Sequence, residues 1–485
     1  MKIETVRRLR GPNVYLSRPA MVARMRLDEL TGRETSEVTG FAERLLRALP
    51  GLAEHHCAAG APGGFVSRLR GGTYFGHVTE HVCIELSLLI GREISFGRTV
   101  SAGEPGRYDV IIECPQDEPD GSRIPVELLE IAVDVVTEIE AGKTFSSTEL
   151  ARATPDQPGP IGRLAGLAAR AELEATGPST RAIIAAARRR GIPVERLGDV
   201  SLVRLGWGSR RRLAWAAMTD RTSGVGVDIA GDKEITRRLF ADAGIPIPAG
   251  GAARSVAEAL RLFAELGGPV VVKPRHGRQG QQVALDLSTA GEVERAFHEA
   301  GSDVVVERQL SGRDYRVLVV GGEAVAAAER HAAQVVGDGH STVAELIEQT
   351  NADPRRGTGH SRELTRITVG DATLRLLAQQ GRTLTGVPES GAEIRLTGAA
   401  NLSTGGTATD VTDRVHPDVT RLCLRVAALI GLDIAGIDLR LPDIGDPLPP
   451  VEGGRVTSGV IEVNAVPGLR MHLSPARGRG RDVGD

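Results

Sequence analysis

Hydrophobic residues recur along the chain with two periods, and the longer period predicts helices. In residues 126–142 (VELLEIAVDVVTEIEAG) apolar side chains return every three or four positions, as on one face of an amphipathic helix. Residues 232–250 (DKEITRRLFADAGIPIPAG) predict a second helix, with Asp232 as its N-cap. Gly244 and the prolines that follow it end this helix.

Short apolar runs predict strands. VVVKP (270–274), VVVER (304–308), IAGIDLRL (434–441) and GVIEVN (459–464) have the length and β-branched content of buried strands. In residues 314–331 (DYRVLVVGGEAVAAAERH) two such runs flank two glycines, which predicts a hairpin. We therefore predict an α+β fold without solenoid repeats.

A proline-rich segment, TPDQPGP at 154–160, predicts a linker. We predict an N-terminal α/β domain over residues 1–155 and a larger domain over residues 156–485. We predict an insertion at about 330–394. The arginines of its first part, Arg330–Arg366, could handle a charged polymer, although a solvated helical excursion fits this part equally well.

Composition narrows the classes of function. The net charge is −3, which gives no support for nucleic acid or an acidic membrane surface as a partner. The four cysteines form no CxxC pair, and the first residues contain no apolar signal core, so we predict a cytoplasmic protein with reduced thiols. No apolar run approaches the ~20 residues that cross a bilayer.

The residues for phosphate chemistry are scattered along the chain. GKT at 142–144 follows a helix and lacks the glycine-rich turn of a P-loop, so we interpret it as a helix end. Lys233 instead opens a predicted helix, Lys273 ends a strand, and a glycine-containing loop follows it. Lysines and loop amides orient a triphosphate, and Glu307 at a strand end could accept from a nucleoside.

Oxygen ligands gather late in the chain. Asp438 lies in one predicted strand, and Glu462 and Asn464 lie in another at positions i and i+2, on the same face. Such a set suits Mg²⁺. Taken singly, each residue has an ordinary alternative, a solvated lysine or a polar edge strand, so the prediction rests on their order and spacing.

Longer stretches resemble cyanophycin synthetases of the ATP-grasp superfamily. The resemblance runs from Arg10 to the C-terminus, and the stretches that carry it are RGPNVYLSRPAMVARMRLDEL, GGTYFGHVTEHVCIELSLLIG, MTDRTSGVGVDIAGDK, NLSTGGTATDVTD, GLDIAGIDLRL and GVIEVNAVPGLRMHLSPARG. Such enzymes build a poly-aspartate backbone that carries arginine. Their ATP-grasp domain adds aspartate, and a later P-loop domain, which we expect this chain to lack, adds arginine.

The resemblance implies an ATP-grasp fold with a lid at about 250–320 and an inserted subdomain at about 330–394. It implies that the nucleotide contacts are Lys233, Lys273, Gly277, Gly280, Glu307 and Asp314, and that Asp438, Glu462 and Asn464 hold magnesium. Arg395, Ser403 and Gly405 would line the reaction centre, although the turn around Ser403 could also be an ordinary surface loop.

The predicted phosphate loop departs from the family pattern KP-x-DGNHGRGV. Here it reads KPRHGRQGQQV, so the family's histidine is Gln279 and its arginine–glycine pair is Gln281–Gln282. Since glycines let backbone amides approach phosphate closely, Gln282 is expected to stiffen or displace this lid.

A second candidate site lies in the N-terminal domain. His77, Glu80 and His81 form H-x-x-E-H, which on a helix puts all three on one face, with Glu85 one turn further on. This spacing is typical of inverted zinc-peptidase motifs. A helix with a polar face is the alternative, while the resemblance favours a Zn²⁺ hydrolytic site that cuts polymer into primers, in a domain that also holds polymer.

We therefore predict an ATP- and Mg²⁺-dependent ligase that adds L-aspartate to the C-terminus of a peptide primer through an acyl phosphate. We expect a homo-oligomer whose partners are a peptide polymer and an amino acid. One alternative is a related ligase that joins other acidic amino acids or dipeptides. Another is a primer-binding and primer-cutting protein with a weakened ATP site.

Overall fold

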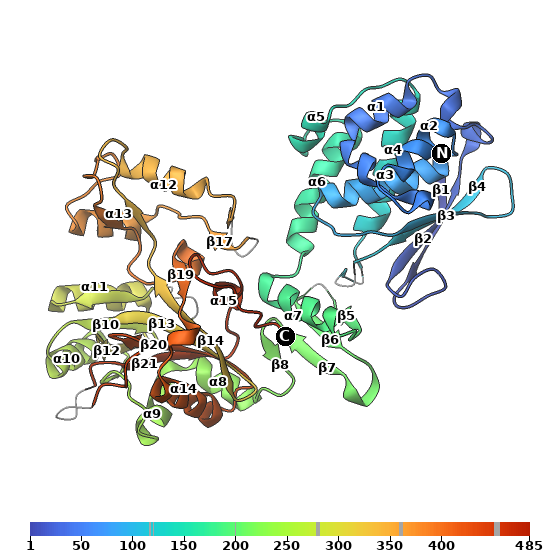
Figure 1. The fold of residues 1–485 in the computed structure, drawn as a ribbon. Helices are drawn as coiled ribbons and strands as arrows, with labels where there is room; N and C mark the ends of the chain where they lie inside the picture. The colour runs from blue at the N-terminus through green and yellow to red at the C-terminus, as the bar shows by residue number, and fades with distance from the viewer. Residues whose placement is uncertain (116–117, 120, 199, 278–281, 358–361, 451–455) are drawn as a thin grey trace. The chain divides into compact units, whose positions relative to one another are not determined.

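The computed structural model describes residues 1–115, 118–119, 121–198, 200–277, 282–357, 362–450 and 456–485. The chain divides into two compact units. Unit 1 comprises Met1–Thr176 and Val194–Val200, and unit 2 comprises Gly177–Pro193 and Ser201–Asp485 (Figure 1). No helix in the described part of the chain combines the length and apolar character needed to span a bilayer.

Unit 1 packs helices onto an antiparallel sheet of order β1-β2-β4-β3. Its strands are β1 (Lys2–Leu9), β2 (Ala20–Arg26), β3 (Gly97–Ser101), β4 (Arg107–Glu113) and β5 (Val194–Arg196). Its α-helices are α1 (Phe41–Ala48), α2 (Gly64–Gly71), α3 (Phe75–Leu89), α4 (Ile124–Glu140), α5 (Ser147–Ala151) and α6 (Gly159–Glu174).

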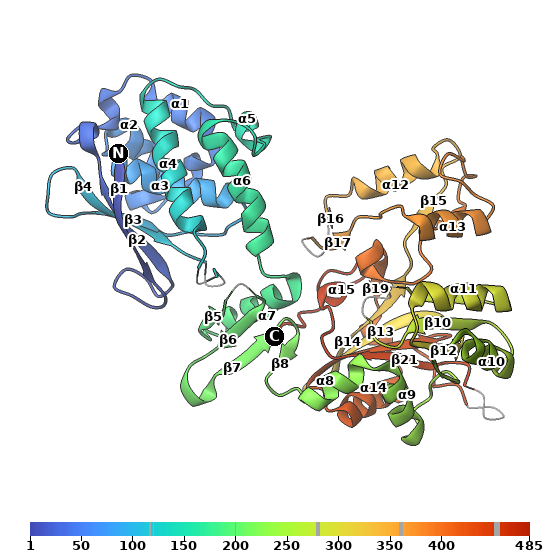
Figure 2. The same cartoon turned by 180° about the vertical axis from the view of Figure 1, so that it is seen from behind.

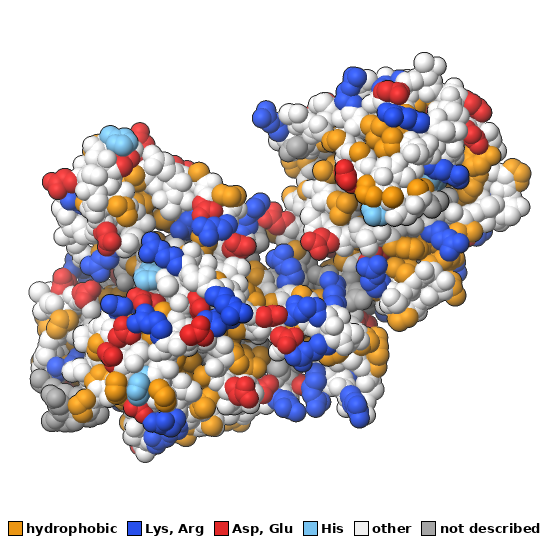
Figure 3. Space-filling view, viewed as in Figure 1, with side chains coloured by type: hydrophobic (Ala, Val, Ile, Leu, Met, Phe, Trp, Pro, Cys, Tyr) orange, Lys and Arg blue, Asp and Glu red, His pale blue; other side chains and the backbone are white. Residues whose placement is uncertain are grey.

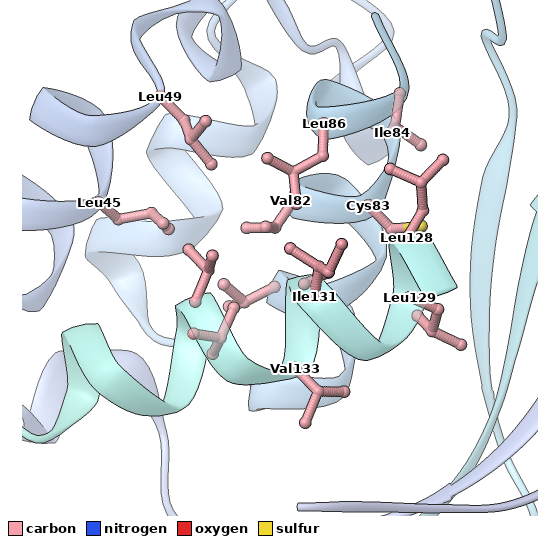
Figure 4. Packing of buried hydrophobic residues seen from close by; sticks show 14 of the residues in the cluster. Leu45, Leu49, Val82, Cys83, Ile84, Leu86, Leu128, Leu129, Ile131 and Val133 are labelled. Carbon is pink, nitrogen blue, oxygen red and sulfur yellow. The ribbon is translucent and has the colours of Figure 1, made fainter. Parts of the chain in front are cut away.

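The core of unit 1 lies between α1, α3 and α4. Figure 4 shows Leu45, Val82, Leu86 and Leu128 among the side chains that these helices bring together. The three- and four-residue spacing of apolar positions in α4 is the reason why one of its faces is buried. The helix predicted at 126–142 is thus confirmed, and Gly142, with φ of 96°, lies just after its end.

Unit 2 contains the remaining elements. Its helices are α7 (Pro178–Arg189), α8 (Gly224–Gly231), α9 (Lys233–Asp242), α10 (Val256–Leu266), α11 (Ala290–Ala300), α12 (Val343–Asn351), α13 (Asp371–Gln379), α14 (Pro417–Ile430) and α15 (Arg470–Leu473). Its strands are β6 (Leu202–Leu205), β7 (Arg212–Trp215), β8 (Met218–Thr219), β9 (Gly250–Ala253), β10 (Val270–Pro274), β11 (Ala284–Leu287), β12 (Val304–Arg308), β13 (Arg313–Val320), β14 (Glu323–His331), β15 (Gln334–Val336), β16 (Arg356–Gly357), β17 (Leu364–Thr365), β18 (Glu393–Arg395), β19 (Thr407–Asp410), β20 (Ile434–Leu441) and β21 (Gly459–Asn464).

Two antiparallel sheets organise unit 2. The smaller has the order β11-β10-β12-β9, and α10 and α11 share its apolar core. The larger has the order β19-β14-β13-β20-β21, and α14 covers one of its faces, as both ribbon views show (Figures 1 and 2). Between β14 and β19, α12 and α13 pack with β15 and β18 around a separate core. The predicted mixed fold of helices and strands is confirmed.

Local signals in the sequence also correspond to observed geometry. The Asp232 carboxylate accepts hydrogen bonds from the amides of Glu234 and Ile235, at 3.0 and 3.1 Å, so it caps α9 as predicted. β13 and β14 form the predicted hairpin, and Gly321 and Gly322 adopt positive φ at its turn. Basic and acidic side chains are interspersed over the face shown in Figure 3, in keeping with the small net charge.

Candidate active site

One face of the larger sheet in unit 2 is lined by charged side chains. Pairing in register places Asp410, Ala328, Arg316, Asp438 and Glu462 directly opposite one another on successive strands β19, β14, β13, β20 and β21. Directly paired residues project their side chains to the same face of a sheet. These four charged residues, separated only by the small Ala328, therefore form one row across the sheet, called here the charged row.

The opposite face of the same sheet is apolar. Val317, Ile437 and Val463 alternate with the polar positions and are buried against α14. Alternation with period two is what separates a packed face from a polar one within single strands. The apolar packing between α14 and this sheet thus determines which face carries the charged row. A shift of the strand register by one residue would bury the charged side chains against α14.

Asp438 lies at the centre of the charged row. Its carboxylate accepts hydrogen bonds from Arg316, including one of 2.8 Å from Nη2, and lies 3.2 Å from Nη1 of Arg330. Burial on its own raises the pKa of this carboxyl, but the charges of Arg316 and Arg330 outweigh it and hold the pKa below its ordinary value. Asp438 is therefore ionised, and two arginines share one carboxylate.

Glu462 and Asn464 lie beside Asp438 on the edge strand β21. Asn464 pairs with Gly436, two residues before Asp438, so its side chain is on the same face. Its Nδ2 donates to the Gly436 carbonyl at 3.3 Å, which directs Oδ1 elsewhere. One carboxylate oxygen of Glu462 lies 3.7 Å from Nζ of Lys233. The structure thus groups the three predicted magnesium ligands along neighbouring strands.

Lys273 and Glu307 form a buried ion pair on the smaller sheet. Nζ of Lys273 lies 2.6 Å from Oε2 of Glu307, and the two residues are each about 5% exposed. They lie on the adjacent strands β10 and β12. Lys233, the first residue of α9, donates from Nζ to the Gly277 carbonyl at 3.2 Å, and burial lowers its pKa.

One cleft brings these groups together. The polar part of its lining consists of Lys233, Thr236, Arg237, Lys273, Glu307 and Glu462. The apolar part of its lining consists of Ala230, Phe240, Ile247, Pro248, Val460, Ile461 and Val463. Three cationic side chains, two carboxylates and apolar side chains in one cleft suit a nucleotide, with its phosphates at the lysines and its base on the apolar side.

Other predicted residues lie elsewhere in unit 2. Asp314 is on β13, where strand register places it opposite Arg330 of β14 and Arg440 of β20. Arg395 ends β18 with an exposed side chain, and its backbone bonds to the side chain of Gln380. Gly280, and with it Gln279 and Gln281, lies outside the described residues.

The predicted reaction-centre turn is a short 3-10 helix, Leu402–Thr404, followed by Gly405. The side chain of Asn401 accepts from the amide of Ser403 at 3.2 Å and so shapes the turn. Gly405 has φ of 95°, and a Cβ there would lie 2.6 Å from Ile367, so only glycine fits. Its carbonyl accepts from Nη1 of Arg356 at 3.0 Å, which ties the turn to β16.

In unit 1 the H-x-x-E-H residues lie on α3. Nε2 of His77 is 3.3 Å from Sγ of Cys57, and one ligand atom each from Cys57, His77 and His81 lies within 4.8 Å of the others. Glu80 instead accepts from Oγ1 of Thr99 at 2.7 Å. Among the described residues of unit 1, Cys57, His77 and His81 therefore form a compact donor set, and Cys57 is absent from the sequence prediction.

Electrostatics in this cluster follow from burial. Burial lowers the pKa of His77 to about 4 and raises the pKa of Glu80 to about 7. The predicted fourth member, Glu85, lies 3.1 Å from Nε2 of His55, whose Nδ1 is 2.9 Å from Nδ1 of His81. The sequence signal for the missed members is the run His55-His56-Cys57, which precedes the motif by about 20 residues.

Arg316 and Arg330 were also missed by the sequence prediction. Each lies on the face of its strand that carries the charged row, and Arg316 comes two residues after Asp314. A charged residue in an otherwise apolar strand indicates a candidate site residue. Which carboxylate it contacts, however, depends on strand register. Pairing between β13 and β20, which are more than 100 residues apart, decides that Arg316 meets Asp438.

Comparison with known proteins agrees with this geometry. A cyanophycin synthase-like N-terminal domain matches residues 22–140, and a RimK-like ATP-grasp domain matches residues 230–342. The chain thus contains one segment similar to each of these two domains. The resemblance to cyanophycin synthetases predicted from the sequence is confirmed, and the ATP-grasp domain implies use of ATP and Mg²⁺.

Relatives extend the likeness beyond these two segments. The cyanophycin synthetase of Nostoc sp. strain PCC 7120 is 42% identical over 491 residues, which cover all of this chain and 52% of that protein. The cyanophycin synthetase of Synechocystis sp. strain PCC 6803 is 40% identical, over all of this chain and 54% of that protein. The chain therefore spans about half the length of these curated relatives.

A solved structure shares the fold. The bifunctional glutathione synthetase from Pasteurella multocida matches with a TM-score of 0.51 and 20% identity, over 97% of this chain and 80% of that one. At this identity the match concerns the fold alone. It supports the ATP-grasp architecture predicted for unit 2.

Proposed function

We propose that this chain is an ATP-dependent carboxylate–amine ligase that extends a peptide primer at its C-terminus, adding L-aspartate through an acyl phosphate. The observation that carries the proposal is the cleft lined by Lys233, Lys273, Glu307 and Glu462, in which each lysine lies beside a carboxylate. The two lysines can neutralise a triphosphate, and Glu462 can hold its divalent ion. The likeness to cyanophycin synthetases over the whole chain supports the choice of substrates.

In this proposal Lys233 and Lys273 neutralise and orient the phosphates, while Gly277 and Gly280 contribute loop backbone and Glu307 and Asp314 serve the nucleoside end. The oxygens of Asp438, Glu462 and Asn464 are hard donors on one sheet face, so they fit Mg²⁺. Mg²⁺, when bound, supplies charge neutralisation at the phosphate oxygens. Lys233 can then leave Glu462 for phosphate, because the two atoms are already 3.7 Å apart.

The reaction proposed has two steps. An oxygen of the primer's terminal carboxylate attacks the γ-phosphorus of ATP, and ADP leaves. The neutral amine of aspartate then attacks the acyl carbon, the amine loses a proton, and phosphate leaves. Arg395, with the Ser403–Gly405 turn, would hold the oxyanion of the second step, since this turn offers small side chains and backbone amides.

The domain roles proposed follow the predicted limits. Residues 1–155 would bind polymer, and residues 156–485 would carry out ligation, with a lid at about 250–320 and an inserted subdomain at about 330–394. The sheet β11-β10-β12-β9 with α10 and α11 supports the lid, because it carries Lys273 and Glu307 on elements that pack around a core of their own.

Mass spectrometry of products tests the proposal. The protein is incubated with ATP, Mg²⁺, aspartate and a cyanophycin-type primer, and the expected result is a primer heavier by one aspartyl unit, with one ADP released per unit. Glu462→Gln should abolish the gain while the fold is retained, because Glu462 is partly exposed. Glu265→Gln, on the exposed face of α10, serves as the matched control. Absence of any gain with aspartate overturns the aspartate assignment, and absence with every acidic amino acid and dipeptide overturns the ligase.

A second function is favoured by the cluster of Cys57, His77 and His81. Two neutral imidazoles and a thiol are donors that suit Zn²⁺, and Glu80 follows one of them in the order of a metal peptidase motif. We propose metal-dependent cutting of the polymer in unit 1, with Zn²⁺ held by these residues or by the predicted set of His77, His81 and Glu85. Loss of cleavage after chelation, and after His81→Ala but not His56→Ala, tests it.

A further inference from the structure

A buried imidazole lies over the charged row of unit 2. His472 belongs to the short helix α15 and is 2% exposed. Its neighbour Met471 packs on Ala328 and Ala408, and Leu469 packs on Leu318 and Ala326. All four of these partners lie on the same sheet face as the charged row, by strand register. α15 therefore covers this face.

The imidazole is unusual because neither of its nitrogens has a hydrogen-bond partner among the described residues. Nε of Arg330 is likewise buried and without a partner there, although Nη1 of the same side chain reaches Asp438. A buried polar atom left unpaired costs about 1–3 kcal/mol. Three such atoms over one patch of a sheet together lower the stability of the fold. Unpaired buried polar atoms of this kind persist mainly at functional sites.

The chemistry of these three atoms is complementary. A neutral imidazole has one N–H donor and one lone pair, whereas Nε of arginine only donates. Burial and the charges of Arg316 and Arg330 lower the pKa of His472 to about 3, so the ring is neutral near pH 7. One ring nitrogen can thus accept from Arg330, and the other retains a proton for an oxygen of the reacting group.

We propose that His472 is a positioning residue. One of its ring nitrogens accepts a hydrogen bond from Nε of Arg330, and this bond turns the guanidinium away from Asp438 and toward the carboxylate or acyl phosphate of the substrate. The inference rests on the proposed ligase function and names a further residue for it. Asp438 has a second arginine, Arg316, so it stays paired when Arg330 turns.

The test compares His472→Leu with His472→Gln. Leucine keeps the volume and removes both nitrogens, so kcat should fall roughly 10–100-fold, as for loss of other orienting partners, with KM for ATP unchanged. The melting temperature of unit 2 should stay the same or rise, because unpaired polar atoms have left the core. Glutamine keeps an acceptor and a donor and should recover most of the lost kcat. Met471→Leu is the matched control and should behave as wild type.

A double-mutant cycle ties the effect to Arg330. In an Arg330→Lys background, which lacks Nε, His472→Leu should cause no further loss of kcat. Wild-type kcat in His472→Leu, equal losses for leucine and glutamine, or a fall in melting temperature that parallels kcat each overturn the role of His472 and leave the ligase proposal standing. Absence of ADP release from the wild-type protein overturns the ligase proposal and, with it, this role.

Discussion

Lys273 and Glu307 contribute both to the stability of unit 2 and to its proposed ATP site. The pair is buried at 2.6 Å on adjacent strands, so Lys273→Met leaves a carboxylate buried without its partner. We expect the free energy of unfolding to fall by about 3–5 kcal/mol, and ATP binding to be lost. Chemical denaturation and titration calorimetry measure the two effects.

A double variant separates these effects. Lys273→Met with Glu307→Leu removes both charges, and replacing a buried pair by apolar residues is often neutral or stabilising. Stability should therefore return while ATP affinity does not. Lys143→Met, which breaks an exposed ion pair in unit 1, is the control and should change neither quantity. Wild-type ATP affinity in the double variant would contradict the assigned contact.

Glu80 makes the stability of unit 1 dependent on pH. Burial raises its pKa to about 7, so between its ordinary value and pH 7 the folded state binds more proton than the unfolded state. Stability then falls as pH rises through this window. His77, with a pKa lowered to about 4, makes stability rise with pH instead. This effect is confined to pH values below about 6.5, where the ring titrates in the unfolded state.

Glu80→Gln should therefore stabilise unit 1 at pH 8 and have little effect at pH 5. At pH 8 the wild-type protein holds a buried carboxylate, which costs about 3 kcal/mol by this shift. Glutamine can still accept from Thr99. Thermal melts at both pH values measure the difference, with Glu54→Gln on the exposed surface as control. Equal stabilisation at pH 5 and pH 8 would argue that the pKa of Glu80 is ordinary.

At the scale of elements, the segment before β11 carries glutamine at position 282, where the family pattern has glycine, and this change lowers stability. Gln282 has φ of 56°, a left-handed conformation that costs a residue with a Cβ about 1–2 kcal/mol. Gln282→Gly should relieve this cost and raise the free energy of unfolding of unit 2 by about 1 kcal/mol. Urea denaturation measures the change.

Alanine at the same position is the control for this prediction. Gln282→Ala removes the same polar atoms but keeps a Cβ, so it should give none of the gain. If both variants stabilise unit 2 equally, the side chain of Gln282 and not its backbone conformation is unfavourable.

At the scale of the whole molecule, the two units have separate hydrophobic cores. Because each core can melt on its own, we expect two transitions in calorimetry. ATP with Mg²⁺ at 100 times Kd should stabilise the transition of unit 2 by about 2.7 kcal/mol and leave that of unit 1 in place. A single transition that shifts as one would show that the units unfold together.

Several features could be predicted from local sequence alone. The period of apolar residues predicted α4, the pair Gly321–Gly322 predicted the β13–β14 hairpin, and Asp232 predicted the cap of α9. Each depends on residues a few positions apart, so no tertiary information is needed. The residue types along β20 and β21 also predicted which side chains share a face, because alternation is fixed within a strand.

Tertiary structure decided which of these side chains meet. Strand register places Arg316 and Arg330 beside Asp438, and the fold of unit 1 brings Cys57 to His77 and His81. It also placed His472 over the charged row, although nothing in its local sequence indicates a polar neighbour. Sequence determines the alternation and the turn chemistry because these are local, whereas contacts between distant strands and helices depend on how the cores pack.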